Sequence, residues 1–187
     1  MYKRQIYPQG SFRLGTVVRP IRKNGEFDID LVCRISKTKD QTTQADLKRL
    51  VGDRLKDRED LKERLEECRR CWRLNYEPRL HMDVLPCLPN AERPPNGILL
   101  TDRELHHWQS SNPVDYANWF RWQMQVAFDL KRQELAASMQ AAVEEVPEWQ
   151  VKTPLQRVVQ VLKRHRDLSF KVGDPNAPVS IIITTLS

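Results

Sequence analysis

With 187 residues the chain is long enough for one domain with a small addition and too short for two domains of about 150 residues each. Its composition, 40% hydrophobic and 30% charged, excludes a disordered chain, and no run approaches the roughly 18 apolar residues of a membrane span or the apolar region of a signal peptide, so we expect a cytoplasmic protein. The net charge of +6 favours polyanionic partners such as nucleotides or nucleic acid.

The first half of the chain alternates predicted strands with helices and loops. Residues 26–35, 72–76 and 79–88 are short apolar runs, rich in β-branched or aromatic residues, and are predicted to be strands. In residues 42–70 leucines and a valine recur at helical spacing among dense charge, which predicts one or two surface helices. Residues 89–97 contain three prolines, two asparagines and a glycine, and we expect a loop.

The second half predicts two longer helices. Asn112-Pro113 is a cap followed by proline in the first turn, and the broad apolar face after it predicts one long helix that extends to Leu135. A second helix is expected to begin at Thr153-Pro154. Its periodicity predicts an inward face of Leu155, Val158, Val159 and Leu162 and an outward face of Arg157, Lys163, Arg164 and Arg166.

The four cysteines do not form the framework of a disulfide-rich module. Cys68 and Cys71 have half of a zinc-site spacing, but no second pair of cysteine or histidine residues stands at a matching spacing. Cys33 and Cys87 fall in apolar, strand-like runs. We therefore expect reduced thiols rather than a structural zinc site.

Two aspartates interrupt the first predicted strand. Aspartate is depleted from strands, yet Asp28 and Asp30 alternate with apolar residues, and the period of two places both carboxylates on one face. Their α-carbons would lie roughly 6.6 Å apart, which suits a pair of cations about 3.5 to 4 Å apart. An EF-hand is excluded, because residues 31 and 32 continue the strand where that loop needs a third acid and a glycine.

Asp83 repeats this anomaly in the run 79–88. If the two strands are neighbours, about 4.8 Å apart, Asp83 completes a cluster of three carboxylates. Such carboxylates repel one another unless divalent metal neutralises them, so two ions of Mg²⁺ or Mn²⁺ are expected. The alternative is three separate structural aspartates, each bound to one of the many arginines.

Gly10-Ser11 stands shortly before these acids. The glycine frees the backbone to approach a ligand, the serine supplies a hydroxyl donor, and a turn of this kind can bind phosphate. Taken with the three acids, the segments 9–16 and 27–32 resemble the nucleotidyltransferase signature of the polymerase β superfamily and, more narrowly, the bacterial cGAS/DncV-like nucleotidyltransferases. Further segments that carry the likeness, in the same order, are 81–86, 152–157, 162–167 and 178–186.

The resemblance implies an α/β (α+β) fold, a polymerase β-like core with a small mixed sheet flanked by helices. Enzymes of that family join nucleoside triphosphates into cyclic di- or trinucleotides, second messengers that switch on the effectors of antiphage (CBASS) defence. By the same resemblance Asp28 and Asp30 hold both metal ions, and Asp83 binds the catalytic ion and helps to activate the attacking 3′-hydroxyl.

Contacts to the triphosphate also follow from the resemblance. Ser11, with the backbone of Gly10, would contact the donor triphosphate, and Lys163 and Ser180 would clamp its outer phosphates. For Lys163 the alternative is an ordinary solvated lysine. Some relatives place a tyrosine after that serine to stack on the donor base; this chain has Ile181, so the stacking partner stays open.

The likeness also predicts how the chain is divided. Residues 1–150 would form the catalytic core and residues 151–187 the start of a C-terminal helical region. Because relatives begin with a further helix and this chain stops inside an apolar run, we expect a fragment of a longer enzyme that is poorly soluble and weakly active or inactive alone. For residues 181–185 local propensity predicts a strand, whereas the resemblance implies a helix.

The expected partners are nucleoside triphosphates and effector or regulatory proteins of an antiphage system, with no membrane and no requirement for nucleic acid. Two alternatives stay open. One is another polymerase β-type nucleotidyltransferase that acts on RNA, a protein or a small molecule. The other is a catalytically silent module that binds nucleic acid through its basic surface. The intact set of three acids argues against the silent module.

Overall fold

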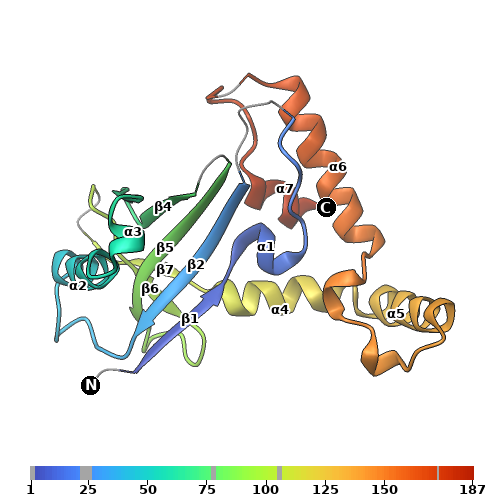
Figure 1. Ribbon diagram of the computed structural model, residues 1–187, viewed down its shortest axis with the longest axis horizontal. Helices are drawn as coiled ribbons and strands as arrows, with labels where there is room; N and C mark the ends of the chain where they lie inside the picture. The colour runs from blue at the N-terminus through green and yellow to red at the C-terminus, as the bar shows by residue number, and fades with distance from the viewer. Residues whose placement is uncertain (1–2, 22–26, 77–78, 105–106, 172) are drawn as a thin grey trace.

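A mixed sheet of seven strands organises the chain in the computed structural model, which describes residues 3–21, 27–76, 79–104, 107–171 and 173–187 (Figure 1). The central strands β2 (Phe27–Ile35) and β5 (Leu80–Pro89) run parallel to each other. The outer strands are antiparallel to their neighbours: β1 (Arg4–Pro8) lies beside β2, β4 (Trp72–Tyr76) lies beside β5, and β3 (Leu65–Glu67) lies beside β4. Two short strands, β6 (Ile98–Leu100) and β7 (Gln109–Ser111), extend the sheet from the end of β5.

Helices cover both sides of the sheet (Figure 1). One side carries α2 (Gln44–Lys56) and α3 (Glu59–Lys62). The other carries α1 (Gly10–Leu14), α4 (Pro113–Gln123), α6 (Pro154–Ser169) and α7 (Ser180–Leu186). Helix α5 (Gln125–Met139) and two 3₁₀ turns (Val143–Glu145 and Glu148–Gln150) connect α4 to α6. Among the helices in this part of the chain, none combines the length and the apolar character that a membrane span needs.

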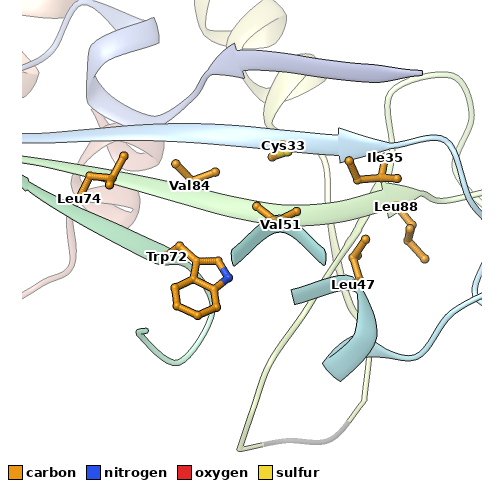
Figure 2. Close-up of a cluster of buried hydrophobic side chains, with 8 residues drawn as sticks. All are labelled: Cys33, Ile35, Leu47, Val51, Trp72, Leu74, Val84 and Leu88. Atoms are coloured by element: carbon orange, nitrogen blue, oxygen red, sulfur yellow. The ribbon is translucent and has the colours of Figure 1, made fainter. Parts of the chain in front are cut away.

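The main core lies between the sheet and α2 (Figure 2). The indole N–H of Trp72 also donates a hydrogen bond to the Lys48 carbonyl at 2.8 Å, which satisfies the one polar atom of this large side chain. Because side chains alternate along a strand, burying this face leaves the opposite face of the same strands free for polar residues. The buried core residues are Cys33, Ile35, Leu47, Val51, Trp72, Leu74, Val84 and Leu88.

The three predicted strands are confirmed as β2, β4 and β5, although residue 26 lies outside the described residues. The helices predicted in 42–70 are confirmed as α2 and α3, but the prediction is wrong for the end of that range. Leu65 lies in β3 and pairs with Leu74 in a hairpin. The spacing of four residues between Leu61 and Leu65 is close to one helical turn. It is also a multiple of the strand period of two, so this spacing does not distinguish a helix from a strand.

The one long helix predicted after Asn112 is two helices. The Asn112 side chain caps α4 by accepting from the Asp115 N–H at 3.1 Å, as expected. Met124 leaves the helical region with φ −115° and ψ 7°, and α5 starts after it. Met124 is buried with Phe120 and Val159 against α6, so tertiary packing sets the break.

At the C-terminus the structure contains the helix α7. The helix implied by the family resemblance is therefore confirmed, and the strand expected from local propensity over 181–185 is wrong. Hydroxyls of this segment donate to carbonyls four residues earlier, as Thr184 does to Ser180 at 2.8 Å and Thr185 to Ile181 at 2.8 Å. These bonds and the packing of Ile183 offset the weak helix propensity of a β-branched run.

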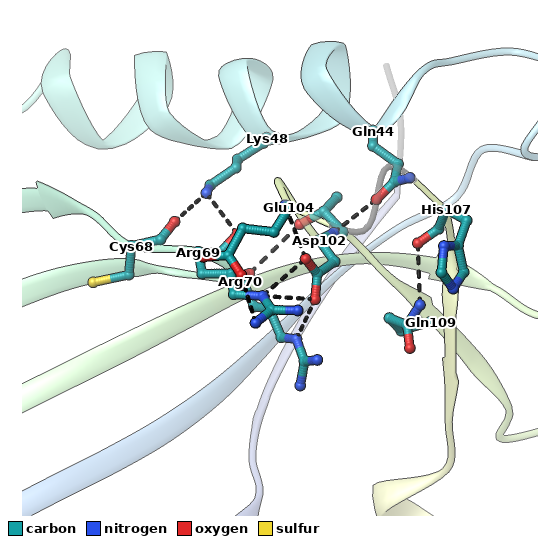
Figure 3. Close-up of polar contacts among 10 residues, drawn as sticks. Gln44, Lys48, Cys68, Arg69, Arg70, Asp102, Glu104, His107 and Gln109 are labelled. Carbon is teal, nitrogen blue, oxygen red and sulfur yellow. Dashed lines mark hydrogen bonds and ion pairs between the residues drawn. The ribbon is translucent and has the colours of Figure 1, made fainter. Parts of the chain in front are cut away.

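A buried aspartate anchors the tip of the β3–β4 hairpin (Figure 3). The Asp102 side chain is fully buried and accepts from Arg69 Nε at 2.9 Å and from Arg70 Nε at 2.6 Å. Lys48, which is buried in α2, donates to the carbonyls of Cys68 and Arg69. These contacts hold the hairpin in place and thereby set the position of β4 beside β5.

Candidate active site

A cavity of about 960 Å³ lies where α1, α4, α6 and α7 meet the start of β2. Asp83 is not among its lining residues, but lies next to Asp30 in the sheet. The structure thus gathers residues from Gln9 to Thr184, which are 175 positions apart in the sequence, around one opening. Six of the seven site residues predicted from the sequence line this cavity: Gly10, Ser11, Asp28, Asp30, Lys163 and Ser180.

The three predicted carboxylates share one sheet face. The parallel register of β2 and β5 pairs Asp30 with Asp83 and Asp28 with His81. Burial, reinforced by the nearby carboxylates of Asp83 and Asp28, raises the pKa of Asp30 from 3.8 to about 6, against a smaller opposing effect of Arg73. The carboxylates are therefore close enough to repel one another, as the sequence predicted.

Asp83 has an arginine partner. Arg73, the residue opposite it on β4, donates from Nε and Nη2 to the two oxygens of Asp83, both at 2.8 Å. This is a bidentate, charge-assisted pair, and it raises the pKa of Arg73. The alternative to a metal site was that each aspartate binds an arginine. Asp83 makes such a contact in this structure.

The acids suit a hard divalent cation at Asp28 and Asp30. Their donor atoms are all oxygens, and burial and carboxylate repulsion, which raise the pKa of Asp30, disfavour an ionised form that a bound cation would stabilise. Within the described residues no group of three acidic, histidine or cysteine side chains is close enough to hold a metal ion. Arg73 uses one acceptor site on each oxygen of Asp83, and each carboxylate oxygen has a second.

Helix α1 packs its first turn against Asp30. The N–H of Gln9 donates to the Asp30 carbonyl at 2.9 Å. Gly10 has φ 61°, and a Cβ atom on this residue would lie 2.5 Å from Asp30 Oδ2. Only glycine fits this position, and it brings Ser11 to the same cavity as the carboxylates.

Gly10 and Gly173 both line the cavity, and we expect Gly10→Ala to disturb the carboxylates and Gly173→Ala to leave them in place. Both residues have positive φ, 61° and 79°, so both substitutions carry the left-handed strain of roughly 1–2 kcal/mol. Only at Gly10 must the new methyl group also displace Asp30, because nothing lies within 4 Å of a Cβ at Gly173. Thermal melting should show the larger loss for Gly10→Ala, and titration with Mg²⁺ and nucleoside triphosphates should show weaker binding for that variant than for Gly173→Ala. Equal effects of the two substitutions would contradict this placement of Gly10.

Lys163 is buried, which corrects the prediction that it faces outward with the arginines of its helix. It is 3% exposed, and its Nζ donates to the carbonyl and the hydroxyl of Thr16, both at 3.2 Å. Burial, followed by the charge of Arg166, lowers its pKa. An ammonium group has three donors, so Lys163 keeps one hydrogen for a ligand in the cavity.

Hydrogen bonds add to apolar contacts in deciding which face of α6 points inward, where Val159 is buried as predicted. Gln156 donates to the Leu14 carbonyl at 2.9 Å, and Gln160 donates to the Val17 carbonyl at 2.7 Å. Together with Lys163 they hold residues 14–17 against the helix. Two residues predicted to point inward are consequently exposed, Val158 at 47% and Leu162 at 43%.

Ser180 begins α7, and its Oγ accepts a hydrogen bond from Arg166 Nη1 at 2.9 Å. The following Ile181 lines the cavity and is 53% exposed. Three aromatic residues also line the cavity: Phe27, Tyr116 and Phe170. Lys163, Arg166 and Lys171 also line the cavity, and because among the described residues only Arg166 has an acidic partner there, Asp167, the wall formed by α6 and the segment after it carries a net positive charge.

The sequence reasoning missed Arg73 and Arg166. The strand pattern of 72–76 contains the signal for Arg73, because the alternation that turns Trp72 and Leu74 to the core turns Arg73 to the face of the aspartates. Arg166 lies three residues after Lys163 and hence on the same helix face, a spacing that could have identified it.

Comparison with known proteins supports the fold and identifies similar proteins. Residues 4–86 match the family model described as "Cyclic GMP-AMP synthase DncV-like, nucleotidyltransferase domain". A c-di-GMP synthase from Roseivirga ehrenbergii is 35% identical over 183 residues, which is 98% of this chain and 48% of that protein. The chain thus spans about half the length of the curated relative it matches.

Solved structures share the fold at lower identity. The CD-NTase CdnG of Bradyrhizobium diazoefficiens in complex with GTP superposes with a TM-score of 0.71 at 22% identity, covering 97% of this chain and 56% of that one. The GTP-bound form of DncV from Vibrio cholerae gives 0.70 at 22% identity, covering 98% and 43%. The predicted α/β fold, a polymerase β-like core with a mixed sheet and flanking helices, is confirmed by these matches.

Proposed function

We propose that the cavity binds nucleoside triphosphates and joins two of them into a cyclic dinucleotide, because residues 4–86 match the DncV-like nucleotidyltransferase domain model and a c-di-GMP synthase is 35% identical to this chain. The observation that carries the proposal is that acids on β2 and cations on α6 line one cavity. A triphosphate bound with metal ions needs acids to hold the metal ions and cationic side chains to contact the phosphates. The relative named c-di-GMP synthase favours GTP as the substrate.

Two of the aspartates would bind metal ions, and the third would contact the attacking hydroxyl. Asp28 and Asp30 would hold two divalent ions of the kind that polymerase β-like enzymes generally use, Mg²⁺ or Mn²⁺. When bound, these ions neutralise charge on the triphosphate and favour the alkoxide form of a ribose hydroxyl. Asp83, oriented by the bidentate contact with Arg73, would accept a hydrogen bond from the attacking 3′-hydroxyl through the second acceptor site of one of its oxygens.

The phosphate contacts would come from the other walls of the cavity. Ser11 lies beside the carboxylates and would donate to the donor triphosphate, and Lys163 and Ser180 would contact its outer phosphates. Attack on the α-phosphate then releases pyrophosphate, and a second transfer in the reverse sense closes the ring. We further propose that the product serves a CBASS-type antiphage system and acts on effector proteins of that system.

The test is product analysis with labelled nucleotides. The protein is incubated with Mg²⁺ and each nucleoside triphosphate, alone and in pairs, and the products are treated with phosphatase and identified by mass spectrometry. A phosphatase-resistant cyclic dinucleotide supports the proposal. Label transferred to RNA, to a protein or to a small molecule would support the first alternative. Salt-sensitive nucleic-acid binding without nucleotide turnover would support the silent module.

Ser11→Ala and Lys163→Met should weaken the use of nucleotides without unfolding the protein. Each loses a hydrogen bond to phosphate, and a bond of that kind contributes roughly 1.5 to 3 kcal/mol, so KM for the triphosphate should rise about ten- to a hundredfold. Methionine keeps the length of the buried stem of Lys163. Arg157→Ala, which removes an exposed cation from the same helix, is the control and should leave KM unchanged. Unchanged kinetics in Lys163→Met would show that this lysine holds Thr16 and does not contact the triphosphate.

A further inference from the structure

Arg166 connects α6 to the start of α7, which lies beside it (Figure 1). Its Nη1 donates to Ser180 Oγ at 2.9 Å and to the Pro178 carbonyl at 3.4 Å. Its Nε and Nη2 donate to Oδ1 of Asp167, at 2.8 and 2.6 Å. The side chain is only 20% exposed, so contacts on both edges of the guanidinium hold it in one orientation.

This contact determines which way the hydroxyl of Ser180 can act. A serine hydroxyl has one donor hydrogen and two acceptor sites, whereas a guanidinium is permanently charged and has donors only. The oxygen of Ser180 must therefore accept from Arg166, and its own hydrogen must point away from the arginine. Ser180 lines the cavity.

The position of Ser180 in the helix leaves that hydrogen available to a ligand. Other hydroxyls of α7 donate to carbonyls four residues earlier: those of Thr184, Thr185 and Ser187. Ser180 is the first residue of α7, so no helical carbonyl stands four residues before it. Its hydrogen thus has no acceptor of the kind that the other three hydroxyls use.

We infer that Arg166 is a positioning residue that sets the Ser180 hydroxyl as a hydrogen-bond donor toward the outer phosphates of a bound nucleoside triphosphate. This inference rests on the proposed function and adds a residue to it. Asp167 fixes the guanidinium plane and balances its charge. The essential property of residue 166 is therefore the rigid donor geometry of arginine rather than its positive charge, and lysine is not an equivalent replacement.

A double-mutant cycle tests the inference. The variants are Arg166→Lys, Ser180→Ala and the combination of both, with Arg157→Lys as a control at an exposed arginine of the same helix. Binding of GTP and of GMP in the presence of Mg²⁺ is measured by calorimetry, and each variant is checked by its melting temperature. We expect each single variant to weaken GTP binding by about tenfold, the value of one hydrogen bond to a charged group, and the double variant to bind as weakly as either single one. Binding of GMP, which lacks the outer phosphates, should not change.

Three results would overturn the role of Arg166: full GTP affinity in Arg166→Lys, a double variant whose losses multiply to about a hundredfold, or an equal loss for GMP. Full GTP affinity in Arg166→Lys would mean that only the positive charge of residue 166 matters. Losses that multiply would mean that Arg166 acts independently of Ser180. An equal loss for GMP would mean that Arg166 only supports the fold. If the wild-type protein binds no nucleoside triphosphate, the proposed function itself fails and the inference fails with it, so the two failures are told apart by the wild-type measurement.

Discussion

Asp30→Asn is expected to raise the free energy of unfolding of the metal-free protein at pH 8 and, at the same time, to remove Mg²⁺-dependent nucleotide turnover. Burial and the neighbouring carboxylates raise the pKa of Asp30 from 3.8 to about 6, so ionising it costs the folded state about 3 kcal/mol relative to the unfolded chain. Asparagine removes that cost. It also removes a charge that would hold both ions, which is worth several kcal/mol in the transition state, on the order of a thousandfold in rate.

The pH dependence of stability gives the sign of this effect. Because the pKa of Asp30 is higher in the folded protein, the folded state binds the proton more tightly, and this contribution to stability is fully present below pH 3.8. It is lost as the pH rises from 3.8 through about 6. Denaturant unfolding at several pH values, without metal, should show that decline in the wild-type protein and not in Asp30→Asn.

Two controls sharpen the comparison. Asp40→Asn removes a charge from an exposed loop and should reproduce the wild-type pH profile. Saturating Mg²⁺ and nucleotide should stabilise the wild-type protein at pH 8 much more than Asp30→Asn, because bound cations favour the ionised carboxylate. A metal-free protein that is less stable after the Asp30→Asn substitution would show that this carboxylate is a structural partner and would refute its catalytic assignment.

Asp83→Asn should have the opposite effect on stability. Repulsion among the three carboxylates, taken alone, predicts that replacing any one of them leaves the metal-free protein as stable as the wild type or more so. The structure changes that expectation for Asp83, because Arg73 binds both of its oxygens at 2.8 Å and the Asp83 side chain is 14% exposed. Loss of this pair should destabilise the protein by roughly 1.5–3 kcal/mol, the range for hydrogen bonds to charged groups.

The catalytic effect of Asp83→Asn should separate binding from chemistry. GTP binding with Mg²⁺ should change little, because Asp28 and Asp30 stay in place, whereas turnover should be abolished, because no carboxylate then contacts the attacking hydroxyl. The double variant Asp83→Asn with Arg73→Gln should recover part of the stability and none of the activity, since it removes the unpaired charge. A stability gain in Asp83→Asn alone would mean that repulsion outweighs the ion pair.

The features that the sequence determined by itself are those governed by neighbours along the chain. The alternation of Asp28 and Asp30 with apolar residues places both carboxylates on one sheet face, because strand periodicity is a local property. The same holds for the starts of α4 and α6, whose caps at Asn112 and Thr153 act within three residues. Glycine at position 10 likewise meets a local backbone requirement, because its φ is 61°.

Tertiary structure decided the features in which distant segments compete. Residues 181–185 have the propensity of a strand, but packing of Ile183 and hydroxyl-to-carbonyl bonds make them helical. Lys163 appears on the charged side of its helix in the sequence, yet it is buried because the carbonyl and hydroxyl of Thr16, 147 residues away, accept its hydrogens. The pairing of Asp83 with Arg73 likewise depends on the register between β4 and β5. A hydrogen-bond partner so far along the chain leaves no trace in local periodicity, so only the folded structure can assign it.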